Sequence, residues 1–223
     1  MTPIFDWAFA LSILPLLVEA LAVTIQATFL GMVVAMVLGL AFALARRAES
    51  RVISWTAALV VEFVRSTPLL VQLYFLFYVL PELGIQLSPL ATGVTALGVH
   101  YAAYCSEVYR SGIERIPAGQ WEAAQALNLS RIRTWYRVVL PQAIPPIVPA
   151  LGNYLVAMFK DTPLLSAITV VEILQQGKIL GSETFRYVEP LTLVGILFLA
   201  LSLASATLIR SLELRLRLPA MRR

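Results

Sequence analysis

The sequence predicts an all-α, polytopic membrane protein with five transmembrane helices in a single domain that covers residues 1–223. Hydrophobic residues make up 59% of the chain and charged residues only 13%, whereas a soluble domain carries roughly 25% charged residues. The apolar residues stand in long blocks, and basic residues flank these blocks. This pattern indicates a membrane protein surrounded by lipid. The net charge of +4 therefore does not indicate a nucleic-acid-binding protein.

A helix needs about 20 predominantly apolar residues to cross the hydrocarbon core of a bilayer. The first apolar block has no Asp, Glu, Lys or Arg between residues 21 and 45, and Arg46 and Arg47 follow it. The second block is interrupted by Glu62 and Arg65, and four prolines crowd the start of the fourth. The predicted spans cover residues 19–46, 52–80, 86–108, 141–160 and 188–210.

Residues 162–177 are the ambiguous part of this assignment. Their apolar run, residues 164–173, is too short to cross a bilayer. We expect a short or re-entrant helix on the outer side, packed against protein, and a sixth span is the alternative.

The basic residues predict the orientation of the chain. With the N-terminus outside and the C-terminus in the cytoplasm, 13 of the 17 Lys and Arg residues lie in cytoplasmic segments, three lie outside and Arg65 lies in a span. Cytoplasmic segments carry the excess of positive charge in membrane proteins, so this orientation is favoured over its reverse.

A long hydrophilic segment, residues 110–140, connects the third and fourth predicted spans. Within it, the run Q-W-E-A-A-Q-A-L at residues 120–127 favours a short helix. The small side chains of Ala123 and Ala124 predict a flat face that can enter a groove on a partner, with Glu122 beside it to pair with a cation. The alternative is an ordinary amphipathic helix on the lipid surface.

The residues that follow predict a tight turn and a second short helix. Asn128 suits a left-handed helix end, and Ser130 can cap a new helix at residues 131–139. Pro141 is expected to limit the extension of that helix.

Four segments of the chain resemble one protein family. The run G-Q-W-E-A-A-Q-A-L-N-L-S, followed twelve residues after Asn128 by Leu140 and Pro141, resembles the EAA loop of ABC importer permeases. Residues 62–72, 104–112 and 159–164 are similar to segments of the polar amino-acid uptake family, which includes the histidine, glutamine, arginine and opine types. The family usually has Gly in place of Asn128, and the A-L-N version is similar to permeases for ectoine and hydroxyectoine.

The resemblance implies a type I ABC importer permease fold in the bacterial cytoplasmic (inner) membrane. It implies a complex with two ATPase subunits, an extracytoplasmic solute-binding protein and a second permease chain, either another copy or a related chain. Segment 110–140 then forms the loop that couples the permease to the ATPases. The coupling residues that the resemblance indicates are Gly119, Gln120, Glu122, Ala123, Ala124, Leu127, Asn128, Leu140 and Pro141.

The resemblance also implies uptake of a polar amino acid or a related zwitterion such as ectoine, driven by ATP hydrolysis in the partner subunits. The chain itself has no G-x-x-x-x-G-K-[ST] phosphate loop, so ATP and Mg are expected to bind only the partner ATPase. We expect this chain to bind no cofactor and to be no enzyme. One cysteine, Cys105, permits no internal disulfide, and no Cys/His cluster has the spacing of a metal site.

Several polar residues lie within or beside the predicted spans, where charged side chains are costly and usually face protein or water. Glu62 and Arg65 stand three residues apart, as do Glu107 and Arg110, and this spacing favours an ion pair on one helical face. These pairs are expected to be structural, and a place beside the solute path is the alternative. Further candidates for the solute path, of which the last three can instead satisfy a helix end, are Thr67, Gln72, Tyr74, Lys160, Asp161 and Thr162.

Two other functional classes stay open on the residues alone. A secondary transporter driven by an ion gradient needs ligands for the coupling ion and commonly has inverted repeats, and the sequence shows neither clearly. A membrane assembly protein without transport activity needs only the spans and the hydrophilic loop.

Overall fold

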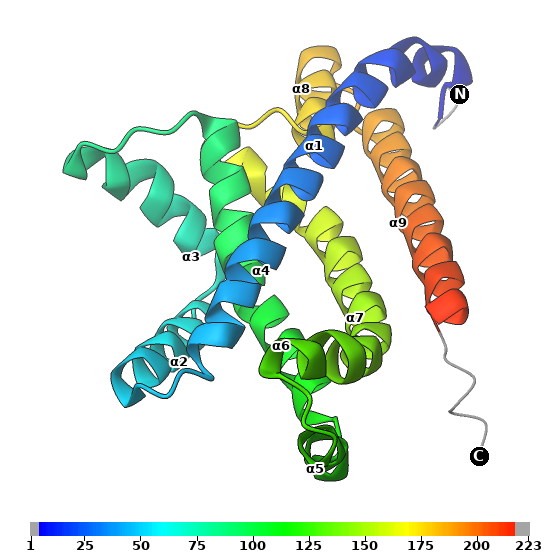
Figure 1. Ribbon diagram of the computed structural model, residues 1–223. Coiled ribbons are helices and arrows are strands. Elements are labelled where there is room, and N and C mark those ends of the chain that lie inside the picture. The colour runs from blue at the N-terminus through cyan, green and yellow to red at the C-terminus, as the bar shows by residue number, and fades with distance from the viewer. Residues whose placement is uncertain (1–4, 217–223) are drawn as a thin grey trace.

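The computed structural model describes residues 5–216, and every regular element in that range is helical (Figure 1). Arg217, Arg222 and Arg223 of the predicted cytoplasmic tail lie outside the described residues. The α-helices are α1 (Trp7–Ala45), α2 (Arg51–Ser66), α3 (Leu69–Tyr74), α4 (Pro89–Glu114), α5 (Ala118–Ala126), α6 (Arg131–Thr134), α7 (Leu140–Asp161), α8 (Ile173–Thr184) and α9 (Val188–Leu216). The π- and 3-10 segments are η1 (Phe75–Val79), η2 (Leu80–Leu83), η3 (Trp135–Val139) and η4 (Thr162–Ile168).

The centre of the fold is the long contact between α1 and α4. In Figure 1, α1 crosses α4 diagonally. Glycines on both helices allow the backbones to approach closely. A Cβ atom added to Gly39 would lie 2.9 Å from the carbonyl oxygen of Ala102, and one added to Gly98 would overlap Val34. Small residues at helix interfaces favour association in lipid, because close packing there takes the place of the hydrophobic effect.

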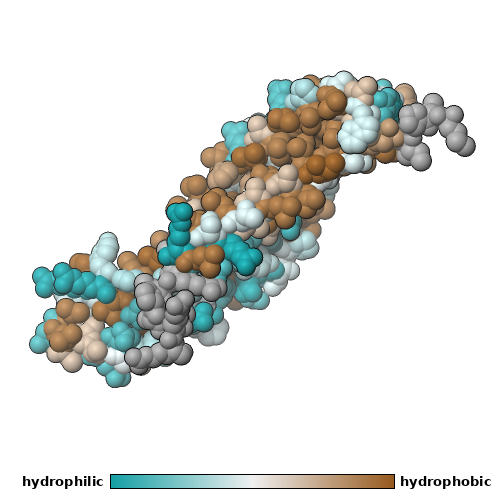
Figure 2. All heavy atoms as spheres, turned by 90° about the vertical axis from the view of Figure 1, so that its right-hand side faces the viewer, coloured by the Kyte–Doolittle hydropathy of each residue, from teal (hydrophilic) through white to brown (hydrophobic). Residues whose placement is uncertain are grey.

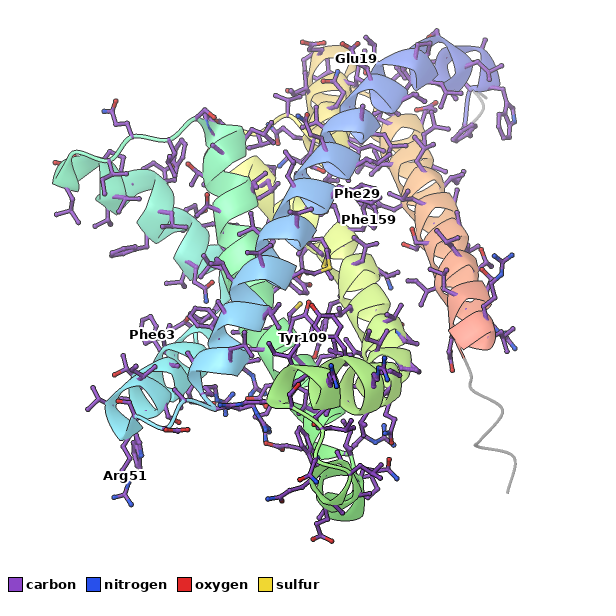
Figure 3. All side chains as sticks on the ribbon, in the orientation of Figure 1. Glu19, Phe29, Arg51, Phe63, Tyr109 and Phe159 are labelled. Carbon is purple, nitrogen blue, oxygen red and sulfur yellow. The ribbon has the colours of Figure 1, made fainter. Side chains whose placement is uncertain are left out.

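Further contacts hold the remaining helices around this pair. The rings of Phe29 in α1 and Phe159 in α7 meet edge to face, with centroids 6.3 Å apart (Figure 3). At the start of α1, Asp6 caps the helix and lies 3.4 Å from Arg186, which also pairs with Glu189 in α9. The α8–α9 turn is thereby fixed to the N-terminal end of α1.

α9 faces outward along most of its length. Only 6% of its most apolar stretch is buried, and the exposed side chains include Ile196, Leu199, Leu203 and Leu208. Figure 2 looks onto this side of the molecule and shows hydrophobic residues over most of its upper part, with hydrophilic residues gathered lower down. The apolar face is suited to contact with lipid.

Three helical stretches in the described chain are long and apolar enough to cross a membrane, namely α1, Arg131–Ile168 and α9. The bent pair Arg51–Ser66 and Leu69–Leu83 is a fourth if it counts as one span. α4 has 26 residues but is less apolar, and it is covered by α1, α2 and α7. The five predicted membrane crossings therefore stay a prediction. The low hydropathy of α4 is explained by its position inside the bundle, where protein and not lipid surrounds it.

The second predicted span, residues 52–80, is not the continuous helix that the sequence led us to expect. α2 and the stretch Leu69–Leu83 are bent by 104° relative to one another. The break is at Thr67, whose extended backbone (φ −107°, ψ 139°) is favoured because Pro68 follows it. As a result, α2 lies at the lower end of the molecule, whereas α3 turns toward the upper end (Figure 1).

The prediction that Pro141 limits the second loop helix is wrong, because α6, η3 and α7 form one continuous helical stretch. In η3 the N–H of Leu140 donates to the carbonyl of Trp135, five residues earlier. The side chain of Gln142 donates to the carbonyl of Val138 at 2.7 Å. The wider π-turn accommodates Pro141, whose ring and missing N–H would disrupt a regular α-helix.

Residues 162–177 form η4, a turn at left-handed Thr169 (φ 66°) and the first part of α8, which extends farther than expected. Leu165, Ile168 and Ile173 are 0% exposed. The expected packing of this segment against protein is confirmed, and its place on the outer side of the membrane stays a prediction.

We expect Gly39→Ala to lower the thermal stability of the purified protein. The added methyl group meets backbone atoms of α4 that cannot move aside, and overpacking of this kind costs about 1–3 kcal/mol. Gly195→Ala is the matched control, because a Cβ there meets nothing within 4 Å and alanine favours the helix by about 1 kcal/mol. Equal unfolding midpoints for the two variants in detergent would contradict the close α1–α4 contact.

Candidate functional site

A stripe of polar side chains runs along the face of α4 that is turned away from α1. The stripe residues share one side of the helix because they are spaced i, i+4, i+7 and i+11, and they are His100, Tyr104, Glu107 and Ser111. The contacts with α1 come from the opposite side of α4, at Gly98, Ala102 and Cys105. One helix therefore presents small residues to α1 and polar residues to the other side.

Tyrosine rings from α4 and α7 gather beside this stripe. The ring of Tyr154 in α7 lies 6.0 Å from that of Tyr101 and 5.6 Å from that of Tyr104, centroid to centroid. The hydroxyl of Tyr101 donates a 2.6 Å hydrogen bond to Asp161 at the end of α7. Asp161, a predicted path residue, is thus brought to the same cluster.

Gln72 connects the cluster to the bend between α2 and α3. Its amide Nε2 donates to the Thr67 hydroxyl at 2.7 Å and to the Val64 carbonyl at 2.8 Å. Its Oε1 lies 3.2 Å from Nδ1 of His100. Gln72 and Thr67 therefore both lie at the bend, and Gln72 also reaches the polar face of α4.

Three arginines from different elements converge on Glu107 near the lower end of the stripe. Arg46, which follows α1, pairs with one carboxylate oxygen, and Arg110 lies 2.7 Å from the other. Arg65 in α2 is 3.7 Å from Glu107, and its guanidinium lies 5.5 Å from the centre of the Tyr104 ring. Glu107 thereby connects α1, α2 and α4 through one carboxylate.

The structure confirms the predicted pair of Glu107 and Arg110, but the predicted pair of Glu62 and Arg65 is wrong. α2 packs against α4, and Arg65 there contacts Glu107 instead. Glu62 is exposed and accepts a long hydrogen bond of 3.4 Å from the Ser66 hydroxyl.

The other predicted path residues lie apart from this cluster. Tyr74 is 41% exposed on α3, beside Tyr78. Lys160 lines a cleft of about 310 Å³ between the end of α7 and α9. Thr162 is buried and donates to the carbonyl of Phe159, so it satisfies a helix end.

The second candidate region is α5, which projects from the lower end of the molecule (Figure 1). Ala124 is only 3% exposed and packs against the chain, so the expected flat face formed by Ala123 and Ala124 together is wrong. Spacing of i, i+3, i+4 and i+7 instead places Gly119, Glu122, Ala123 and Ala126 on one exposed side. Three of these four side chains are small, and a Cβ on Gly119 would meet nothing within 4 Å.

The turn after α5 has the predicted conformation. Asn128 is left-handed (φ 51°), and the N–H of Leu129 donates to the carbonyl of Ala124 at 3.0 Å. The side chain of Ser130 accepts a hydrogen bond from the N–H of Arg133, as expected for a helix cap. Leu127 stays 73% exposed before the turn.

Two contacts fix α5 to the helix that follows. The rings of Trp121 and Trp135 pack edge to face with centroids 5.8 Å apart. The side-chain amide of Gln142 donates to that of Gln120 at 3.2 Å. Leu140 and Pro141 lie at the start of α7 and not on α5.

Sequence reasoning missed most of the tyrosine cluster. A signal existed for Tyr104, because His100, Tyr104 and Glu107 recur with helical spacing inside an apolar block. Tyr154 comes from another helix, and no local pattern places it beside Tyr104. Arg46 was interpreted only as a basic residue that ends a span, although its side chain turns back to Glu107.

Comparison with known proteins places the chain among transport permeases. The family of binding-protein-dependent transport system inner membrane components matches residues 35–218. A protein of Sinorhizobium fredii, described as a probable amino-acid ABC transporter permease, is 51% identical over 95% of this chain and 91% of its own length. The glutamine transport system permease of Escherichia coli is 32% identical, over 96% of this chain and 99% of its own.

Solved structures agree with this result. A crystal structure of an amino acid ABC transporter with histidines superposes with a TM-score of 0.89 at 32% identity, covering 96% of this chain and 100% of the other. An inward-facing methionine ABC transporter superposes with a TM-score of 0.71 at 20% identity, covering 90% and 94% of the two chains. The second likeness concerns the fold alone.

We expect Glu107→Gln to lower the unfolding midpoint, because it leaves three guanidinium groups close together without their shared carboxylate. The loss is about 2 kcal/mol, less than for a fully buried pair, because the Glu107 side chain is 23% exposed. The control is Glu114→Gln, which removes the ion pair between Glu114 and Arg110. The Glu114 side chain is 49% exposed, so this variant should lose only about 0.5 kcal/mol of stability. A Glu107 variant as stable as the control would rule out this role of the carboxylate.

Proposed function

The chain belongs to the family of binding-protein-dependent transport system inner membrane components, and on this premise we propose how it moves its solute. It is the permease subunit of an ABC amino-acid importer, a non-catalytic and multi-pass component of the inner membrane. Such a system implies ATPase subunits and a binding protein as partners. We propose that the solute is a polar amino acid and that the polar stripe of α4 lines its path.

The observation that carries this proposal is the contrast between the two sides of the α1–α4 pair. The side of α1 that faces away from α4 exposes Val33, Val37, Leu40 and Leu44, which suit lipid. The opposite side, on α4, carries an imidazole, a phenol and a carboxylate. Polar groups at membrane depth usually face protein or water, so a second permease chain against this side would enclose a polar path.

The chemistry of the cluster suits a zwitterion. Asp161 can attract the ammonium group of an amino acid, and Arg65 can attract its carboxylate, because the three arginines around Glu107 leave that cluster positive. Tyr101 and Tyr154 add hydroxyl groups and ring faces between these charges. Relatives with glutamine and other amino-acid names support this class of solute, and the A-L-N sequence at residues 126–128 keeps ectoine among the solutes to be tested.

The loop 110–140 is the proposed point of coupling to the ATPases. The exposed side of α5 is flat and carries Glu122, so it can enter a groove and pair with a cation there. The continuous stretch Arg131–Ile168 begins at this loop and contains Tyr154 and Asp161. A displacement of the loop by the ATPases is therefore passed to path residues along one helix, which biases a two-state equilibrium between inward and outward openings.

The decisive experiment is solute uptake by the complete importer in proteoliposomes. We expect uptake of a polar amino acid that needs ATP and the binding protein, with basic, acidic and neutral amino acids and ectoine compared. Uptake that persists without ATP under a sodium or proton gradient would identify a secondary transporter. Unchanged accumulation in cells lacking this chain would identify an assembly protein.

We expect Ala123→Trp and Glu122→Ala to reduce uptake and the co-purification of the ATPase subunits while the permease still inserts. The first fills the flat side of α5, and the second removes its charge. Glu183→Ala is the control for the loss of an exposed carboxylate, since Glu183 lies on α8 at the other end of the molecule. Normal uptake and normal assembly in both α5 variants would remove the coupling assignment.

The proposed orientation places the N-terminus outside and the loop in the cytoplasm. In intact spheroplasts, Thr2→Cys should react with an impermeant thiol reagent, and Arg133→Cys should not. The native Cys105 is 0% exposed and contributes little background. The opposite labelling pattern would reverse the orientation.

A further inference from the structure

A groove of about 910 Å³ lies between the α1–α2 turn and the loop that carries α5 and α6. Arg47 enters it from the α1–α2 turn and Arg131 from the start of α6. Neither guanidinium has a hydrogen bond or an ion pair with another described residue. From this groove we infer a binding site for the phosphate headgroup of an inner-leaflet anionic phospholipid, which rests on the proposed orientation of the loop.

The charge of the groove favours a phosphate. The two arginines supply fork-shaped donors that match phosphate oxygens, and Arg46 next to them is already paired with Glu107. Glu49 also lines the groove, so one negative charge opposes the two positive ones and the balance stays positive. Basic pockets between helices on the cytoplasmic side of membrane proteins commonly hold anionic lipid headgroups.

The walls of the groove favour an amphiphile over a free ion. Leu44 lines the groove and is the last member of the exposed apolar row Val33, Val37, Leu40 and Leu44 on α1. This row gives an acyl chain a continuous apolar path from the bilayer to the two arginines. Ile53, which is 51% exposed, adds an apolar wall from α2.

The aromatic lining agrees with a position at the membrane surface. Trp121 and Trp135 both line the groove, and tryptophan is enriched at the level of lipid headgroups. Trp121 belongs to α5 on the side opposite the exposed row of Gly119 and Ala123. The groove and the proposed ATPase-docking side are therefore on different faces of α5, and a lipid there would connect the loop to the α1–α2 turn without blocking the ATPase.

The test uses the complete importer complex, stripped of lipid in detergent and titrated with phosphatidylglycerol while bound lipid is counted by native mass spectrometry. The variant Arg47→Gln with Arg131→Gln should bind the lipid roughly 30-fold more weakly, as expected for two lost basic contacts. The control is Arg51→Gln with Arg133→Gln, which removes the same charge from arginines outside the groove. Arg51 points away from the molecule at the start of α2 (Figure 3).

Two ligand controls separate the sources of phosphate. Diacylglycerol with the same acyl chains should not be retained, because it lacks the phosphate. Millimolar glycerol 3-phosphate should not displace phosphatidylglycerol, because it lacks the chains, and displacement would overturn the inference of a lipid.

Equal lipid binding by the two double variants would also overturn the inference. So would a wild-type complex that retains no phosphatidylglycerol, the result expected if the second permease chain covers the groove. The number of bound lipids is measured without transport. The lipid test therefore still gives a result if the uptake assay contradicts the proposed function.

Discussion

The fold depends on the close approach of α1 and α4. Because Gly39 and Gly98 let the backbones nearly touch, α1 covers one side of α4, and with α2 and α7 packed beside it α4 does not need the apolar surface of a lipid-facing helix. That freedom permits His100, Tyr104 and Glu107 on its other side. The packing of two glycines and the polarity of the proposed path are therefore two consequences of one contact, and neither can be understood from α4 alone.

Glu107 extends the same logic to the lower end of the molecule. A carboxylate at this depth is costly unless it is paired, and here arginines from the end of α1, from α2 and from α4 itself approach it. Arg65 stands two residues before the bend at Thr67, so the ion cluster holds the end of α2 against α4 where the chain turns into α3. A movement of α2 that changed its angle to the stretch Leu69–Leu83 would have to separate Arg65 from Glu107.

The loop at residues 110–140 combines a firm contact between α5 and the next helix with an exposed side of α5, and this combination suits the transmission of movement. Trp121 packs on Trp135, and the helix continues from there through the π-turn to Asp161, so α5 is mechanically connected to the tyrosine cluster. The exposed side of α5 has almost no side chains to be ordered on binding, which lowers the entropic cost of docking. The groove behind α5 adds a second surface, on which bound lipid would act on the loop from the membrane side.

The sequence alone determined the properties that depend on neighbouring residues and on composition. The long apolar blocks identify a membrane protein, the EAA-type run identifies the permease family, and the left-handed turn at Asn128 and the Ser130 cap follow from local backbone preferences. The contacts between distant elements were decided only by the tertiary structure. Arg65 pairs with Glu107 and not with Glu62, Ala124 turns inward and Ala123 outward, and Tyr154 meets Tyr104, because each of these depends on how one helix is placed against another. Residue spacing defines the sides of a helix, but only packing decides which side is covered.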